Sequence, residues 1–158
     1  MKEYEYSFKV KSIEPYINYC KNNNYNLIDI IKENRRVYEN KHNNKLIARI
    51  TSRIKNNKKD IKLDFKNVSS NNDDLKISLE SIPIKITKRN KKQIDSILKV
   101  LDFYEVTNNI RTRYIYKLND VKFEIDDYEI PQMKIVAIEG LKDEVDKIYK
   151  KIIKIKEV

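Results

Sequence analysis

The sequence is poor in the residues on which several common catalytic and structural sites depend. Among its 158 residues it has one cysteine, Cys20, and one histidine, His42. A single cysteine excludes an internal disulfide, and together with a single histidine it argues against a zinc centre, which usually takes several such ligands. The same shortage argues against hydrolases built on a Ser–His or Cys–His pair. We expect Cys20 to be a buried apolar residue of a helix and His42 to lie on the surface.

Glycine and long apolar runs are also scarce. Gly140 is the only glycine, whereas Walker loops and dinucleotide-binding fingerprints require several. No segment approaches the roughly 18 consecutive apolar residues that mark a membrane-spanning helix, and the first residues lack the apolar run of a secretion signal. The sequence therefore predicts a cytoplasmic protein with no membrane association, and its length fits one domain, residues 1–158.

Positive charge, in contrast, is abundant. Lys and Arg together number 34 against 24 acidic residues, which gives a formal net charge of +10. Such an excess favours a polyanionic partner: nucleic acid, a phosphate compound or a membrane surface. The abundance of Lys, Asn and Ile is also typical of an AT-rich genome, so the positions of the charges say more than their total. Most tyrosines fall on apolar strand faces, as core residues do, and we expect nucleic acid not to be the partner.

The spacing of apolar residues predicts an α+β protein that is mainly antiparallel β-sheet. Alternation with period two predicts about eight strands, and helical spacing predicts about three helices. The strands are expected at 3–10, 26–38, 45–56, 60–66, 75–80, 103–118, 121–126 and 133–139, and the helices at 12–22, 90–101 and after Gly140. Ser12 is the expected N-cap of the first helix, and the polar segment 67–74 is expected to be a mobile loop.

Several predicted strands carry charged residues on one face and apolar residues on the other. In an open sheet such charged rows simply face water. The alternative is a closed barrel whose charged rows point inward, with helices covering the apolar outer faces. Acidic rows that face basic rows in such a barrel would suit a complex of a metal ion with a polyphosphate. The rows are Glu3 and Glu5; Arg49 and Arg53; Lys62, Asp64 and Lys66; Arg111 and Arg113; and Lys122, Glu124 and Asp126.

Short motifs follow one another in a fixed order along the chain, from Glu3-Tyr-Glu5-Tyr-Ser7 and Arg49-Ile-Thr51 to Arg111-Thr-Arg113 and Ala137-Ile-Glu139-Gly140. They resemble the motifs of the CYTH family, the triphosphate tunnel metalloenzymes. This family includes class IV adenylyl cyclases, thiamine triphosphatases and inorganic triphosphatases. The resemblance covers nearly the whole chain, although no single motif in it is specific. The matching residues are Glu3-Tyr-Glu5-Tyr-Ser7 for E-x-E-x-K, Arg49-Ile-Thr51 for R-x-R, Lys66 at a strand end, Glu80, Arg111-Thr-Arg113, the hairpin Asn119-Asp120, Asp126, and Ala137-Ile-Glu139-Gly140 for E-I-E-G.

The resemblance implies a closed eight-stranded tunnel-like barrel with about three flanking helices, and it assigns roles to these residues. Glu3 and Glu5 would be catalytic and, with Asp126 and Glu139, would hold Mg²⁺ or Mn²⁺, which prefer carboxylate oxygens. A second set would contact the phosphates of the substrate, since fixed positive charges stabilise phosphoryl transfer. This set is Arg49, Arg53, Lys62, Lys66, Glu80, Arg111 and Arg113.

Three positions depart from the family pattern, and each departure removes a charge. They are Ser7, Thr51 and Ala137, and Lys9 or Arg53 could substitute from two residues further along a strand. The first hypothesis is a metal-dependent phosphohydrolase that acts on inorganic triphosphate, thiamine triphosphate or a nucleoside triphosphate. The alternatives are a catalytically impaired module that binds a polyphosphate or nucleotide, and an adenylyl cyclase of the class IV type. We favour hydrolysis because no residues indicate a base-and-ribose pocket, and we expect a monomer or a homodimer.

Overall fold

Strands make up most of the computed structural model, which describes residues 2–72 and 74–156. They are β1 (Lys2–Val10), β2 (Asn26–Asn40), β3 (Leu46–Lys55), β4 (Lys58–Asn72), β5 (Leu75–Glu80), β6 (Ile84–Lys85), β7 (Phe103–Leu118), β8 (Val121–Ile130) and β9 (Met133–Gly140). The helices are α1 (Glu14–Asn22), α2 (Lys91–Val100) and α3 (Lys142–Lys156). None of these helices is both long and apolar enough to cross a membrane.

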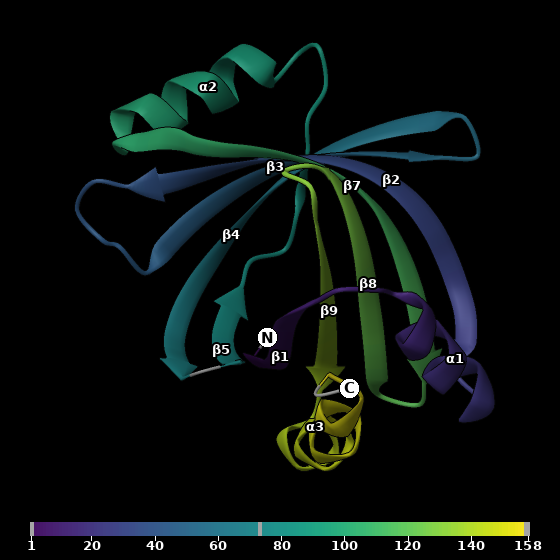
Figure 1. Ribbon diagram of the computed structural model, residues 1–158. Coiled ribbons are helices and arrows are strands. Elements are labelled where there is room, and N and C mark those ends of the chain that lie inside the picture. Colours follow the sequence, from purple (N-terminus) through teal and green to yellow (C-terminus); the bar gives the residue numbers. More distant parts are fainter. Residues whose placement is uncertain (1, 73, 157–158) are drawn as a thin grey trace.

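All the strand pairs are antiparallel, and together they form a closed barrel (Figure 1). The strand order is β3-β2-β7-β8-β9-β1-β5-β4-β6, and an additional pairing of β3 with β4 closes the ring. The two-residue strand β6 pairs only with β4, so eight strands make the barrel wall. The predicted eight-stranded barrel with three flanking helices is therefore confirmed.

The apolar core lies outside the barrel wall, between the wall and the helices. One cluster joins α1 and α3 to the outer faces of β1, β7, β8 and β9, and its buried members include Cys20, Phe123 and Ile152. A second, smaller cluster packs Ile94 and Leu98 of α2 against β3, β4 and the start of β7. On the strands that pack against a helix, the apolar side faces outward, and the alternate side chains therefore point into the barrel.

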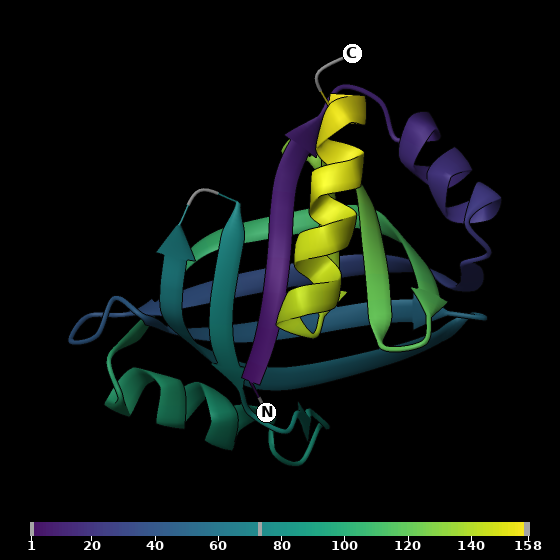
Figure 2. The same ribbon diagram turned by 90° about the horizontal axis from the view of Figure 1, so that it is seen from below.

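Helix α3 lies along β1 on the outside of the barrel (Figure 2). The rings of Tyr6 and Tyr149 stack with their centroids 4.0 Å apart. The Tyr6 hydroxyl donates to Asp146 Oδ1 at 2.7 Å, and the Tyr149 hydroxyl donates to Asp74 Oδ2 at 2.7 Å. These contacts hold the even-numbered side of β1 against the helix, so its odd-numbered residues face the interior.

Two local expectations were wrong. Residues 67–72 are not a loop, because β4 continues through them and pairs with β5 from Asn67↔Leu79 to Asn72↔Leu75; residue 73 lies outside the described residues. An Asn- and Ser-rich composition indicated solvent exposure there, but the backbone still has a partner strand. Ser12 does not cap α1 either: the N-cap is Ile13, and no side chain caps the helix. The hairpin at Asn119 is confirmed, with a positive φ of 53°.

Candidate functional site

The interior of the barrel is a charged cavity of about 670 Å³. The rows of charged residues noted in the sequence point into it and do not face bulk water on an open sheet. Acidic and basic side chains line it in nearly equal numbers. The acidic ones are Glu3, Glu5, Asp60, Asp64, Glu80, Glu124, Asp126 and Glu139; the basic ones are Arg35, Arg49, Arg53, Lys62, Lys66, Lys76, Arg111, Arg113 and Lys122.

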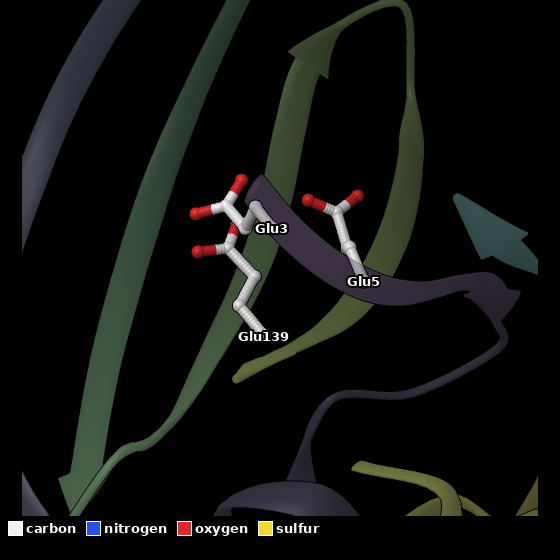
Figure 3. Close-up of side chains that lie close together, drawn as sticks. All are labelled: Glu3, Glu5 and Glu139. Carbon is white, nitrogen blue, oxygen red and sulfur yellow. The ribbon is translucent and has the colours of Figure 1, made fainter. Parts of the chain in front are cut away.

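Three of the predicted acidic residues form a cluster on two neighbouring strands. Glu3 and Glu5 lie on the inner face of β1, and Glu139 lies directly opposite Glu5 on β9. Figure 3 shows their carboxyl groups gathered on one side of these strands. One carboxylate oxygen of each residue lies within 4.8 Å of those of the other two. Three hard oxygen donors at this separation form a suitable donor set for one divalent cation.

The electrostatics of the cluster also fit a cation. Burial raises the pKa of Glu3 to about 7, and a hydrogen bond with Glu80 and the negative charge of Glu80 add to the effect. Burial and the charge of Glu124 raise the pKa of Glu139 well above its usual range, although Lys122 Nζ lies 3.0 Å from Glu139 Oε2. Crowded carboxyl groups that retain protons can release them to a metal ion. Mg²⁺ or Mn²⁺ held by Glu3, Glu5 and Glu139 would supply positive charge next to a phosphate group.

Asp126, the fourth predicted metal ligand, is not a member of this cluster and is bound instead by a network of arginines. Its Oδ1 accepts from Arg113 Nε at 2.7 Å, and its Oδ2 accepts from Arg113 Nη2 at 2.8 Å and from Arg111 Nη1 at 3.2 Å. Arg113 Nη1 also donates to Glu124 Oε2 at 2.6 Å. Neighbouring β7 and β8 bring these groups together, since Arg113 pairs directly with Asp126 in the strand register.

Glu33 on β2 is the centre of the same network and was missed by the sequence analysis. Its side chain is fully buried. Its Oε1 accepts from Arg111 Nε at 2.9 Å and from Nη2 at 2.6 Å, while its Oε2 accepts from Arg53 Nε at 2.6 Å. Arg111 also donates to the Tyr128 hydroxyl, at 2.5 Å. The N–H donors of Arg111 and Arg113 are thus mostly bound to protein acceptors, because a buried charge without a partner is strongly destabilising.

The other predicted phosphate-binding residues differ in how far they are neutralised. Arg49 binds both Asp64 and Glu80, which lie on the adjoining strands β4 and β5. Lys62 Nζ lies 3.3 Å from Asp60 Oδ2. Lys66, by contrast, has no carboxylate within 4.0 Å among the described residues. The same holds for Lys76, which the sequence analysis did not single out and which faces Glu5 across β1 and β5.

The positions that lack a family charge have charged neighbours. Glu124 on β8 lies directly opposite Ala137. Arg35 on β2 lies directly opposite Thr51. Lys76 lies near Ser7, diagonally across the β1–β5 pair. Of the two substitutes considered from the sequence, Arg53 lines the cavity, whereas Lys9 is exposed and is not among the residues that line it.

Comparison with known proteins identifies the architecture. No protein-family model matches the sequence, and no curated protein matches it. Solved structures do match. The PH1012 protein from Pyrococcus horikoshii is 20% identical with a TM-score of 0.71, over 95% of this chain and 87% of that one. A Hippeastrum protein described as a candidate adenylyl cyclase with a dominant triphosphatase activity is 11% identical with a TM-score of 0.68, over 99% and 88%.

A chain of the Schizosaccharomyces pombe Mediator head module also matches, at 14% identity and a TM-score of 0.68, over 96% of this chain and 94% of that one. These observations define the class of structure: it is a closed antiparallel tunnel whose charged side chains face inward. The chain has the CYTH-like fold that its motifs predicted. At these identities the likeness concerns the fold, and function has to be argued from the site.

Proposed function

We propose that the protein is a metal-dependent phosphohydrolase that acts on a small triphosphate, such as inorganic triphosphate, thiamine triphosphate or a nucleoside triphosphate. The observation that carries the proposal is the Glu3–Glu5–Glu139 cluster inside a cavity that also holds nine basic side chains. A cluster of carboxylates alone attracts cations, and a basic cavity alone attracts anions. Both together, in a space of about 670 Å³, match a metal–triphosphate complex.

The acidic and the basic residues of the cavity have different roles in this proposal. Glu3, Glu5 and Glu139 would hold the cation, while the basic residues on the other strands hold the phosphate oxygens in place for in-line attack by water on the terminal phosphorus. The bond from that phosphorus to the bridging oxygen breaks, the shortened chain leaves through this oxygen, and the terminal group departs as inorganic phosphate. Phosphoryl transfer depends mainly on such positioning and on neutralising charge. Arg111 and Arg113 lie inside the barrel, where a nucleic-acid duplex does not reach, so a small anion is the ligand we expect.

Two other functions, nucleotide cyclisation and binding without turnover, can be tested against hydrolysis. A cyclase needs a surface for the nucleobase, but Tyr128 is the only aromatic side chain among the described residues that line the cavity, and Arg111 engages it. A binding module without turnover is favoured by the missing charges at Ser7, Thr51 and Ala137. The double variant Ser7→Lys with Ala137→Glu tests whether the protein is such a binding module. If hydrolysis appears only in this variant, the natural protein binds the ligand without turning it over.

The decisive experiment measures phosphate release from tripolyphosphate, thiamine triphosphate and ATP with Mg²⁺ and with Mn²⁺. We expect turnover of at least one substrate, dependent on the metal. Glu5→Gln should lower it by about 100-fold, because the carboxylate charge that holds the cation is lost. The control is Glu129→Gln, an exposed glutamate on β8 whose change should leave activity intact. No turnover of any substrate above background with either metal rejects the hydrolase.

A further inference from the structure

Arg35 occupies a position in the cavity that the sequence motifs do not mark. It lies on β2, and around the closed barrel β2 is four strands from β1 in either direction. Arg35 therefore lines the wall diametrically opposite the strand that carries Glu3 and Glu5, and all three side chains border the same cavity. A ligand that bridges the cavity from the acidic cluster meets Arg35 on the far side.

The contacts of Arg35 leave most of its guanidinium group unused. Its Nε donates to Thr51 Oγ1 at 3.0 Å, which fixes the direction of the side chain. Its Nη2 lies 4.0 Å from Glu33 Oε1, beyond hydrogen-bonding distance, and its terminal nitrogens have no hydrogen-bond acceptor among the described residues. The side chain is only 15% exposed. Arg111 and Arg113 differ, because carboxylates occupy their donors.

The electrostatic surroundings of Arg35 are unfavourable to it in the absence of a ligand. Burial and the positive charges of Arg111, Arg49 and Arg113 lower the pKa of Arg35 to about 9, and Glu33 only partly offsets them. Glu33 is the nearest carboxylate, and it already serves Arg111 and Arg53. A largely buried cation whose donors are open to the cavity, held among other cations, is a site of surplus positive charge into which an anion fits.

We infer that Arg35, oriented by Thr51, is the principal binding residue for a phosphoryl group of the ligand, and that Arg111 and Arg113 mainly hold the barrel interior together. The choice of a triphosphate as ligand rests on the proposed function; the anion site itself rests on the contacts of Arg35. A guanidinium fork matches two phosphate oxygens. Thr51 replaces the second arginine of the R-x-R motif, and Arg35, paired with it on the neighbouring strand β2, supplies a positive charge at the same register position.

The test is calorimetric titration of the wild-type protein with tripolyphosphate, at fixed salt and without a divalent metal. Arg35→Gln should weaken binding by about 10- to 100-fold, the value of a lost charged hydrogen-bonding group. The control is the adjacent Arg36→Gln, whose side chain points outward beside Glu105 and is 41% exposed. It removes the same charge from the same strand and should change affinity less than about twofold.

A second pair of measurements separates ligand binding from a structural role. Arg35→Gln removes a cation from a cationic cluster and should raise the melting temperature of the free protein, whereas Arg113→Met should lower it. The double variant Arg35→Thr with Thr51→Arg moves the charge to the directly paired position on β3 and should regain most of the lost affinity. Arg35→Lys, which keeps the charge and loses the fork, should bind with intermediate affinity.

These measurements distinguish failure of the Arg35 inference from failure of the proposed function. Equal affinities for Arg35→Gln and Arg36→Gln overturn the inference while a hydrolytic wild type still upholds the proposed function. A drop in the melting temperature of Arg35→Gln, with no recovery of affinity in the charge-swapped variant, also overturns it by showing a structural role. Binding that depends on Arg35 but leads to no hydrolysis upholds the inference and rejects the hydrolase. A wild type that binds no tripolyphosphate overturns the inference, while the proposed hydrolase is judged separately by the phosphate-release assay with Mg²⁺ and Mn²⁺.

Discussion

At the scale of single residues, Glu33 shows how an ionisable group can be fully buried without loss of charge. Burial alone would raise the pKa of Glu33, but the positive charges of Arg113, Arg111, Arg35 and Arg53 outweigh burial and hold this pKa well below its usual range. Three strands, β2, β3 and β7, contribute to this one contact. The carboxylate therefore links them from inside the barrel, on the other side of the wall from the two apolar clusters.

Replacing Glu33 tests this role. Glu33→Gln leaves Arg111 and Arg53 without their buried partner and should lower the free energy of unfolding at pH 7 by about 3–5 kcal/mol. The folded-state pKa is lowered, so the stabilisation is present above the unfolded pKa of about 4.3 and is lost as pH falls below it. The difference between wild type and variant should therefore shrink below about pH 4.3, by up to about 1.4 kcal/mol per pH unit.

The measurement is urea unfolding at several pH values. Glu105→Gln, an exposed residue on the outer side of β7, is the matched control and should change stability by less than about 0.5 kcal/mol. A Glu33→Gln protein as stable as the wild type at pH 7 would contradict the assignment.

The sequence predicted the residues of the acidic cluster but only some of the charged residues around it. Glu3 and Glu5 share a strand face by local alternation, and the resemblance to CYTH proteins supplied Glu139. Glu33 and Arg35 were missed because they share one face of a predicted strand with the apolar residues Ile31 and Val37, so that face shows no continuous charged row. Their importance depends on which residues of β3 and β7 lie opposite them, and strand register is a property of the closed barrel, not of the local pattern.

At the scale of elements, α3 and β1 act as one unit. The outer side of β1 packs on the helix through Tyr6 and Tyr149, and its inner side carries Glu3 and Glu5. Alternation of side chains along one strand thus couples helix packing to the carboxylate cluster. The amphipathic pattern predicted both elements, whereas the stacked ring pair required knowledge of where the helix lies.

Tyr149→Ala removes the stacked ring and the hydrogen bond to Asp74, so the free energy of unfolding should fall by about 2–4 kcal/mol. Tyr149→Phe keeps the ring, loses only the hydrogen bond and should cost about 1 kcal/mol. Chemical unfolding measures both values. Titration with Mn²⁺ should show weaker binding in Tyr149→Ala than in Tyr149→Phe, because β1 loses its support. Equal metal affinities would show that α3 does not position the cluster.

At the scale of the whole molecule, the arrangement of core and cavity follows from one pattern that recurs on several strands. Alternation predicted that several strands have an apolar and a charged side, and the sequence left open which side would face inward. Closure settles this, since β3 pairs with β4 and the charged sides then share one interior. The long β4, misjudged as ending near residue 66, is part of that closure through its pairing with both β3 and β5.

The charged lining has a thermodynamic consequence for any ligand that enters. Charged side chains such as those that line the cavity are strongly hydrated in water, so an anion that enters displaces water from polar atoms while burying little apolar surface. Apolar burial is what gives binding a large negative change in heat capacity. Titrations with tripolyphosphate at 10, 20 and 30 °C, roughly spanning the stable range, should therefore give nearly constant binding enthalpies. A steep fall in enthalpy with temperature would mean instead that the helices outside the barrel rearrange when the ligand enters.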